Sequence, residues 1–363
     1  MKKTVLMAAA LTTLAAHAQD STQQTKQTTN PLTISGYVEG YYSYDFNRPD
    51  NNNRPGFLYN FNRHNEFNLN VGFVKAAYAT ERTRANLAIG VGSYMNANYA
   101  AEPGVLKNIF EANAGYKLSA KNDIWLDIGI IPSHIGFESA IGKDNWTLTR
   151  SMVAENTPYF ESGAKLSYAS ADGKLQLAAL ALNGWQRITR VEGNSLLSWG
   201  TQLTYKPSDK VTLNYSTFIG TDKPDSARLW RYHNNLYGVF QLSEKIGLIT
   251  SLDIGLEQQT PKDKELNTWY TPVAILRITP SSNWAFAFRG EYFSDANGVI
   301  IGTGTPNGFK TTGASVNVDY SPLTNVLLRL ELRHLNSKDE IFEKEGANSR
   351  NNTAITFSTA IGF

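Results

Sequence analysis

The sequence contains no cysteine, which excludes disulfides, thiolate metal sites and cysteine nucleophiles. It also lacks any apolar run long enough to cross a bilayer as a helix. Charged residues make up only 18% of the 363 residues, whereas aromatic residues reach 12%. The histidines of the mature chain are scattered, and neither GxSxG nor GxxxxGK[ST] occurs. We therefore predict no catalytic, cofactor or metal site, and a protein that is not an enzyme.

The first 18 residues carry the three parts of a secretory signal peptide. Lys2 and Lys3 precede an apolar stretch, and Ala16-His17-Ala18 gives small residues before a cleavage point at Gln19. Loss of these two lysines leaves 32 basic residues, from 34, against 32 acidic ones. A neutral mature chain gives no case for nucleic-acid binding. Residues 19–31 are polar, and we expect them to form a flexible periplasmic tether.

From Leu32 to Phe363 the chain alternates apolar and polar residues in segments of about ten residues, the dyad period of strands that face lipid on one side and water on the other. Leu32, Ile34 and Val38 share one face of the first segment, and Glu39 and Asp45 share the other. In the second segment we assign Phe67, Leu69, Val71 and Phe73 to the outer face, and in the third Ala85, Leu87, Ile89 and Val91. The pattern continues to the end of the chain and predicts about sixteen strands.

The connections between these segments alternate between short and long. The short ones are predicted at 80–83, 119–123, 170–173, 206–209, 243–245, 280–283 and 321–325. The long ones are predicted at 47–62, 97–108, 138–158, 185–196, 221–230, 258–266, 296–309 and 336–351. Segregation of loop length by parity is typical of an up-and-down barrel with an even number of strands and both chain ends on the short-turn side. The glycine-rich run Ile301–Gly308 is interpreted as a loop tip, since no helix follows it to bind an anion.

Aromatic residues recur at the short turns, as expected for a girdle at a membrane–water interface. Tyr78, Tyr116, Tyr168, Tyr205 and Tyr320 precede a short turn, and Trp125 and Trp284 follow one. Trp125 has the opposite parity to Ile124, Leu126 and Ile128, which leaves either a bulge or a register error there. Because unpaired backbone groups are costly in lipid, such a sheet has to close.

Four stretches resemble one family, the β-barrel porin-2 (OmpL-like) outer-membrane proteins. They are DIGIIPSHIGFES (Asp127–Ser139), TRSMVAENTPYFESGAKLSY (Thr149–Tyr168), AFRGEYFSD (Ala287–Asp295) and LLRLELRHLNS (Leu327–Ser337). The terminal strand, ending on Phe363, is similar to the last strand of outer-membrane barrels, which the barrel-assembly machinery reads. The resemblance implies an all-β, transmembrane antiparallel barrel over residues 32–363 in the cell outer membrane, surrounded by lipid and lipopolysaccharide. It implies periplasmic N- and C-termini and a porin, but no particular solute.

Inward-facing charges are the candidates for lining the pore, where they would bias which ions pass. They are Glu39, Glu66, Arg84, Glu111, Lys117, Lys165, Arg289, Glu291, Arg329, Glu331 and Arg333. The alternative interpretation is that these residues pair across strands and stiffen the barrel.

The long loop Glu138–Pro158 is a candidate constriction, because the loop at this position in general porins folds inward and narrows the pore. Its candidate residues are Glu138, Lys143, Asp144, Arg150 and Glu155. The alternative is an extracellular loop packed on its neighbours.

Sixteen strands leave a lumen wide enough for water, so the leading hypothesis is a channel for passive diffusion of small hydrophilic solutes or ions. A second hypothesis is a non-conducting barrel whose extracellular loops bind a ligand or partner. A third, lipid hydrolysis at the barrel surface, has no motif to support it. Whether copies associate as a homo-oligomer is left open by the sequence.

Overall fold

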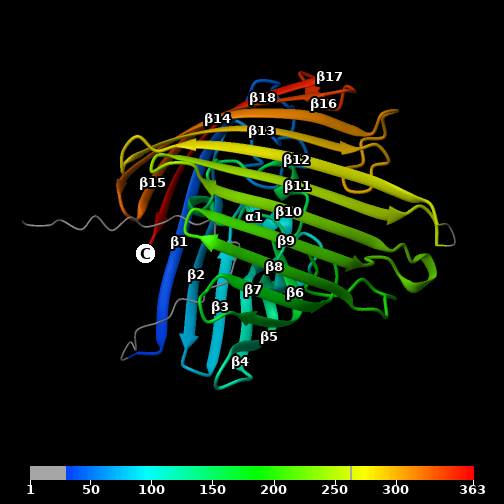
Figure 1. Cartoon of the computed structure of the whole chain (residues 1–363). Helices are drawn as coiled ribbons and strands as arrows, with labels where there is room; N and C mark the ends of the chain where they lie inside the picture. Colours follow the sequence, from blue (N-terminus) through cyan, green and yellow to red (C-terminus); the bar gives the residue numbers. More distant parts are fainter. Residues whose placement is uncertain (1–29, 262–263) are drawn as a thin grey trace, which may run out of the picture.

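The computed structural model describes residues 30–261 and 264–363, which are mainly extended. Within these residues, sixteen antiparallel strands close into one barrel, and β18 pairs with both β15 and β1 (Figure 1). The barrel strands are β1 Leu32–Asp45, β2 Phe67–Ala79, β3 Thr83–Val91, β4 Ile109–Lys117, β5 Asp123–Pro132, β6 Phe160–Ala169, β7 Leu175–Leu182, β8 Ser198–Ser208, β9 Val211–Gly220, β10 Arg231–Gln241, β11 Ile246–Gln258, β12 Leu266–Ile278, β13 Trp284–Asp295, β14 Phe309–Leu323, β15 Val326–Ser337 and β18 Asn351–Gly362. The strands β16 Phe342–Lys344 and β17 Ala347–Ser349 form a separate hairpin in the last long loop.

Short helical turns occupy some of the long loops. They are α1 Ser93–Asn98, η1 Gly104–Asn108, η2 Gly142–Asp144, α2 Met152–Glu155 and η3 Asp225–Ala227. Among the described residues, none of the helices combines the length and the apolar character needed to cross a membrane.

Loop length alternates along the barrel as the sequence predicts. Short turns such as residues 80–82 and 324–325 alternate with long loops such as residues 46–66 and 133–159. The first strand begins and the last strand ends at the short-turn side, since Leu32 pairs with Tyr78 and Gly362 pairs with Tyr37. The predicted strand number and the predicted parity of the loops are both confirmed.

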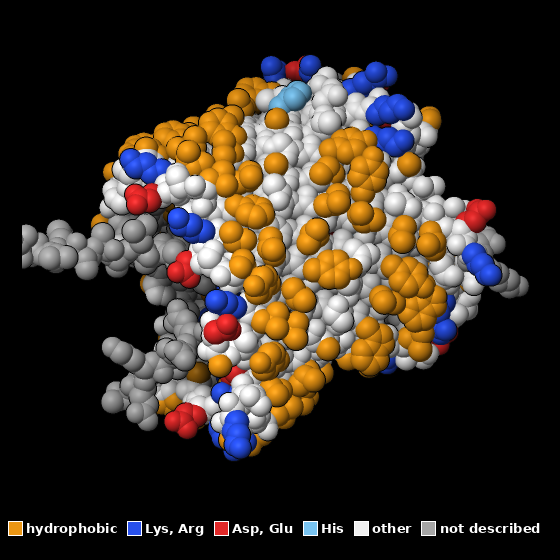
Figure 2. All heavy atoms as spheres, viewed as in Figure 1, with side chains coloured by type: hydrophobic (Ala, Val, Ile, Leu, Met, Phe, Trp, Pro, Cys, Tyr) orange, Lys and Arg blue, Asp and Glu red, His pale blue; other side chains and the backbone are white. Residues whose placement is uncertain are grey.

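The outer wall is apolar, as alternating side chains on a strand require. Ile34, Val74 and Leu236 are more than half exposed on it, whereas inward residues such as Asn235 and Asn317 are fully buried. Figure 2 shows hydrophobic side chains spread across the strands, with charged side chains gathered toward the two ends of the barrel. An apolar band between charged rims is the exterior of a barrel that lies in lipid.

The barrel closes where β18 meets β1, and Phe363 takes part in that seam. Phe363 N–H donates to Gly36 O at 3.0 Å, and Gly36 N–H donates to Phe363 O at 2.7 Å. The phenyl ring lies over Gly36, where an added Cβ would be 2.3 Å from ring atom Cζ. The predicted closure of Phe363 against the first strand is confirmed.

The assignment of faces in β2 is wrong beyond its first residues. Opposite β2, Glu39 pairs with Val71 and Gly40 pairs with Leu69, so Asn70 is an extra residue in a β-bulge. The bulge reverses the parity that follows, and Val71 is buried while Phe73 packs on Tyr37 inside the barrel. The outer face of β2 then passes through Val74 and Tyr78, which are both exposed.

The placement of Trp125 in the aromatic girdle is also wrong. The pairing of β5 with β4 and β6 runs without a register shift through Trp125, so its side chain faces inward and is 8% exposed. Its indole lies 4.3 Å below the Arg84 guanidinium and donates to Asp123. Tyr78, Tyr116, Tyr205 and Trp284, by contrast, are exposed on the outer wall, where a girdle belongs.

Candidate functional site: a loop inserted into the lumen

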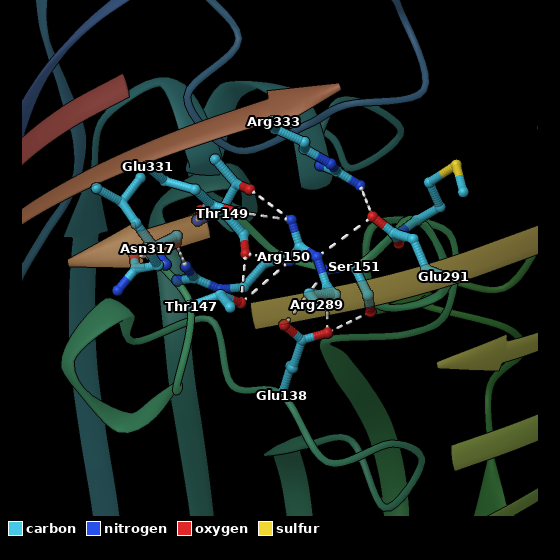
Figure 3. A network of polar contacts seen from close by, with 12 residues as sticks. Glu138, Thr147, Thr149, Arg150, Ser151, Arg289, Glu291, Asn317, Glu331 and Arg333 are labelled. Carbon is cyan, nitrogen blue, oxygen red and sulfur yellow. Dashed lines mark hydrogen bonds and ion pairs between the residues drawn. The ribbon is translucent and has the colours of Figure 1, made fainter. Parts of the chain in front are cut away.

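The connection between β5 and β6 (residues 133–159, the inserted loop) folds into the interior of the barrel. Its Leu148 and Met152 have no exposed surface, although they lie in the longest connection of the chain. The loop reaches across to the strands on the far side of the lumen (Figure 3). This inward course is the one that its length and mixed charge predict.

Two strands of the far wall hold the tip of the inserted loop through Arg289 and Glu331. Arg289 on β13 donates to Thr149 O at 2.7 Å, to Thr147 Oγ1 at 3.1 Å and to Thr149 Oγ1 at 2.9 Å. Glu331 on β15 accepts from Thr149 N–H at 2.5 Å and from Arg289 at 2.8 Å. Between these strands, Asn317 on β14 accepts from Leu148 N–H at 2.9 Å (Figure 3). Backbone groups of the loop are thus paired with fixed charges of the wall.

Further charges of the barrel wall bind the inserted loop on both sides of Thr149. Glu291 accepts from Met152 N–H and from Arg333, both at 2.6 Å. Arg329 donates to Gly142 O at 2.7 Å and to Asn145 O at 3.0 Å. Arg329 is also paired with Asp319 at 2.7 Å. Small wall residues beside these long side chains, such as Ser315 and Ala354 flanking Arg333, leave room for them.

The inserted loop is also tied to itself by Arg150. Its guanidinium donates to the carbonyl oxygens of Ser139, Leu148 and Ala140, at 2.8, 2.6 and 2.9 Å. Glu138 accepts from Ser151 N–H and Oγ–H, and Ser151 caps α2 by accepting from Ala154 N–H. Arg150 and Ser151 are fully buried, so the loop has a polar core of its own.

Burial shifts the titration of the acidic groups on the inserted loop. Burial raises the pKa of Glu138 above its usual value. It raises the pKa of Glu155 to about 7, against the opposing hydrogen bond from Asn60. The Glu155 carboxylate accepts from Tyr59 N–H at 2.9 Å and Asn60 N–H at 3.2 Å, which joins the inserted loop to the loop between β1 and β2.

One flank of the inserted loop packs on an apolar patch inside the barrel, which sequence reasoning missed. Trp146, Phe137 and Val153 of the loop contact side chains of β10 to β13, which are Tyr237, Ile249, Val273, Ile275 and Ala287. The expectation of a polar inner face is wrong here, because this part of the wall faces the loop rather than water. The run Val273-Ala274-Ile275-Leu276, apolar on both parities, was the available signal.

The structure brings five of the predicted pore-lining residues together under the inserted loop. Each of them is at most 6% exposed, and they occupy one stretch of the barrel wall: Arg289, Glu291, Arg329, Glu331 and Arg333. They are ion-paired with each other or with Asp319, as the interpretation of charges that pair across strands predicts.

Other predicted pore-lining residues lie on the opposite wall, where the side chains keep more contact with water. Glu111 is only 8% exposed and pairs at 2.6 Å with Lys75, a residue outside the prediction, whose side chain is 27% exposed. Arg84 pairs with Asp127 at 2.6 Å, with 16% exposure. Lys117 pairs with Asp123 at 3.0 Å, with 24% exposure. Lys165 on β6 is opposite Asp127 of β5 in the strand register.

The remaining candidates are dispersed. Glu39 is fully buried and accepts from Asn70 at 3.0 Å. Glu66 does not lie on a strand, because β2 begins one residue later, and it pairs with Arg63 at 2.8 Å in the loop. Lys143 is exposed on the inserted loop, with its ammonium 5.9 Å from the Tyr37 ring, and Asp144 ends η2 beside it.

The buried pair His134–Glu161 was not predicted. His134 is the second residue of the inserted loop, with Nδ1 2.8 Å from Glu161 and Nε2 2.8 Å from Thr217 O. Sequence showed only that Ser133 and His134 are neighbours. Among the described residues, no cluster of three or more His, Asp or Glu is arranged to hold a metal ion.

A closed sixteen-strand barrel with a lipid-facing exterior and a loop folded into its lumen has the architecture of an outer-membrane porin. The chain belongs to the family described as "Putative beta-barrel porin-2, OmpL-like", which it matches over residues 31–363. As a member of a porin family, it is an outer-membrane barrel of the channel type and not an enzyme.

Solved porins share the fold at low sequence identity. OmpT of Vibrio cholerae in its trimer form has a TM-score of 0.59 at 7% identity, covering 92% of this chain and 99% of that chain. The anion-selective porin from Comamonas acidovorans has a TM-score of 0.58 at 8% identity, with coverage of 92% and 99%. The outer membrane channel DcaP of Acinetobacter baumannii has a TM-score of 0.59 at 12% identity, with coverage of 93% and 99%. No curated protein sequence matches the chain.

Proposed function

We propose that the protein is a channel for passive diffusion of small hydrophilic solutes or ions, with the inserted loop as its constriction. The observation that carries this proposal is the difference between the two walls of the lumen. Charges of β13 and β15 are buried against the loop, whereas Lys75, Arg84 and Lys117 on the other wall remain partly exposed. The water path then runs beside Lys75, Arg84 and Lys117 on β2 to β4, outside the apolar cluster that joins Ala140, Ala154 and Tyr159 of the loop to Val71 of β2 and Ile130 of β5. Fixed charges of both signs along that path would bias which ions pass.

Single cysteines test this path, because the natural chain has none. A Lys75→Cys variant in a planar bilayer should lose conductance when an anionic methanethiosulfonate reagent is added. A Ser315→Cys variant, whose site is 5% exposed on the covered wall, should not respond. Block at Ser315→Cys with none at Lys75→Cys would overturn the proposed path.

Removal of the constriction tests the role of the loop. Deleting Lys143–Thr149 removes Thr149, which Arg289 holds, and Asn145, which Arg329 holds, and single-channel conductance should rise. Unchanged conductance would contradict the constriction role.

A non-conducting barrel that binds a ligand through its extracellular loops is the second candidate. The extensive burial of the inserted loop and of the wall under it favours this candidate, because a filled lumen passes no solute. Silence of the purified protein across many bilayer insertions would select it, and stable conductance steps would reject it.

For the chain as a whole, we propose export with cleavage after Ala18, a periplasmic tether over residues 19–31, and short turns and both ends on the periplasmic side. Residues 1–29, which include the signal peptide and most of the tether, lie outside the described residues. Mass spectrometry of the membrane-extracted protein should find Gln19 as its first residue. The shared fold with a trimer-form porin supports association of copies, which sedimentation in detergent would measure.

A further inference from the structure

A cavity of about 490 Å³ opens at the long-loop end of the barrel. It is formed by the loops β1–β2, β13–β14 and β15–β18 together with Asn156 of the inserted loop. The mouth of a β-barrel is a common place for a ligand site, and this volume lies in the usual range of several hundred Å³. The cavity takes no part in the contacts that hold Leu148 and Thr149 of the inserted loop against β13 to β15.

The apolar part of the cavity is fixed in place by an apolar cluster of the barrel interior. Phe57 lines it and packs edge-to-face on Phe309 with ring centroids 4.8 Å apart, and it also contacts Phe342 at 6.2 Å. Ile301 and Ile341 line it as well and belong to the same apolar cluster. A fixed aromatic ring with aliphatic neighbours offers a surface for the apolar face of a small ligand.

The polar groups of the cavity are uncharged or acidic. Asn156 uses its amide N–H groups on Phe57 O at 3.2 Å and Met152 O at 2.8 Å, so its carbonyl oxygen is available as an acceptor. Tyr59 supplies a hydroxyl and Glu340 an exposed carboxylate. Of the described residues that line the cavity, none is Lys or Arg, which disfavours an anion.

We propose that this cavity is a binding site for a neutral sugar, a solute with an apolar ring face and several hydroxyl groups. The ring face would lie on Phe57, and the hydroxyl groups would meet the Asn156 carbonyl, Glu340 and the Tyr59 hydroxyl. The inference extends the proposed function, on which it rests, by naming a solute class for the channel mouth.

The cavity is joined to the constriction by hydrogen bonds. Glu155 accepts from Tyr59 N–H at 2.9 Å, and Asn156 donates to Phe57 O, so two adjacent residues of the inserted loop hold the aromatic side of the cavity. A sugar bound there lies directly beside the root of the constriction.

Gly302 allows the cavity to be filled without strain. It lines the cavity, and a Cβ added there meets no atom closer than 3.9 Å. Gly290 is the matched control, since its added Cβ has no neighbour within 4 Å and it alternates with the inward Arg289 and Glu291, so it faces lipid.

The test is saturation-transfer NMR on the full-length protein in detergent, with methyl glucoside, glucosamine and glucuronate as probes of equal ring size. Methyl glucoside should give a signal with the natural protein and with Gly290→Leu, and its affinity should fall at least tenfold in Gly302→Leu. Glucuronate should bind more weakly than methyl glucoside. Absence of signal from the natural protein, an unchanged signal in Gly302→Leu, or tighter binding of either charged sugar would overturn the proposal.

Conductance in potassium chloride is recorded for the same proteins to separate the two proposals. Sugar binding by a protein that does not conduct would refute the channel and leave the site standing. Conductance without sugar binding would refute the site and leave the channel standing.

Discussion

Arg289 and Glu331 form an ion pair of 2.8 Å across β14, and both side chains also bind Thr149 of the inserted loop. Neither side chain has exposed surface. A buried ion pair adds little net stability by itself, but removal of one partner is costly because it leaves the other charge unpaired. The pair therefore fixes the tip of the inserted loop to the barrel wall, and its loss would release the tip.

We predict that Arg289→Ala releases the inserted loop from the wall. Loss of one partner of a buried ion pair costs about 3–5 kcal/mol, enough to shift a docking equilibrium by more than roughly a hundredfold. Single-channel conductance should rise, and limited proteolysis should cut within residues 143–149. Arg82→Ala is the control, since Arg82 is exposed at a short turn and should change neither readout. A proteolysis pattern identical to that of the natural protein would contradict the prediction.

Glu155 should make the docking of the inserted loop depend on pH. Burial raises its pKa to about 7, so the folded protein binds this proton more readily than the unfolded chain does. The stabilisation is fully present below the unfolded pKa of about 4.5 and is lost as the pH rises through about 7, by roughly 3 kcal/mol in total. The measurement is the urea midpoint at pH 4.5 and pH 8 for the natural protein and Glu155→Gln. The stability of the natural protein relative to Glu155→Gln should decrease from pH 4.5 to pH 8. A stability difference that does not change with pH would refute the raised pKa of Glu155.

Gly36→Val should weaken the seam of the barrel. A Cβ at Gly36 would be 2.3 Å from Cζ of Phe363, so the ring must leave its position against β1. Loss of one cross-strand contact costs about 1 kcal/mol, which should lower the temperature at which the barrel unfolds on a heat-modifiability gel. Gly40→Val lies on the same strand, where the nearest atom to an added Cβ is 3.9 Å away, and should have a smaller effect. An equal loss in both variants would argue against a specific role of the Phe363 ring.

Gly255→Val should destabilise the long-loop end of the barrel. An added Cβ would be 1.8 Å from Cζ2 of Trp269, whose indole is held by His233 at 6.1 Å and by Arg231 at 5.7 Å. Overpacking of this kind costs about 1–3 kcal/mol. Guanidinium unfolding followed by tryptophan fluorescence measures the loss, with Gly290→Val as the lipid-facing control. A midpoint equal to that of the control would mean that the indole has room to move.

Much of the fold could be predicted from the sequence because its signals are local. The alternation of apolar and polar residues in a strand depends only on which face meets lipid, and loop length depends only on where the chain turns. The faces of β2 were predicted wrongly because one extra residue, Asn70, reverses the parity of the strand. Trp125 was predicted wrongly because its side chain packs inside the barrel on Arg84. Both depend on neighbours that are distant along the chain.

The sequence by itself therefore determined the barrel, its strand number, the closure at Phe363 and the presence of a long loop after β5. Only the tertiary structure decided that Arg289, Glu291, Arg329 and Glu331 bind this loop rather than face water, and that loops from three parts of the chain enclose a cavity. Contacts such as Arg289 to Thr149 join residues 140 positions apart, and their partners are chosen by the curvature of the closed sheet. No local pattern carries that information.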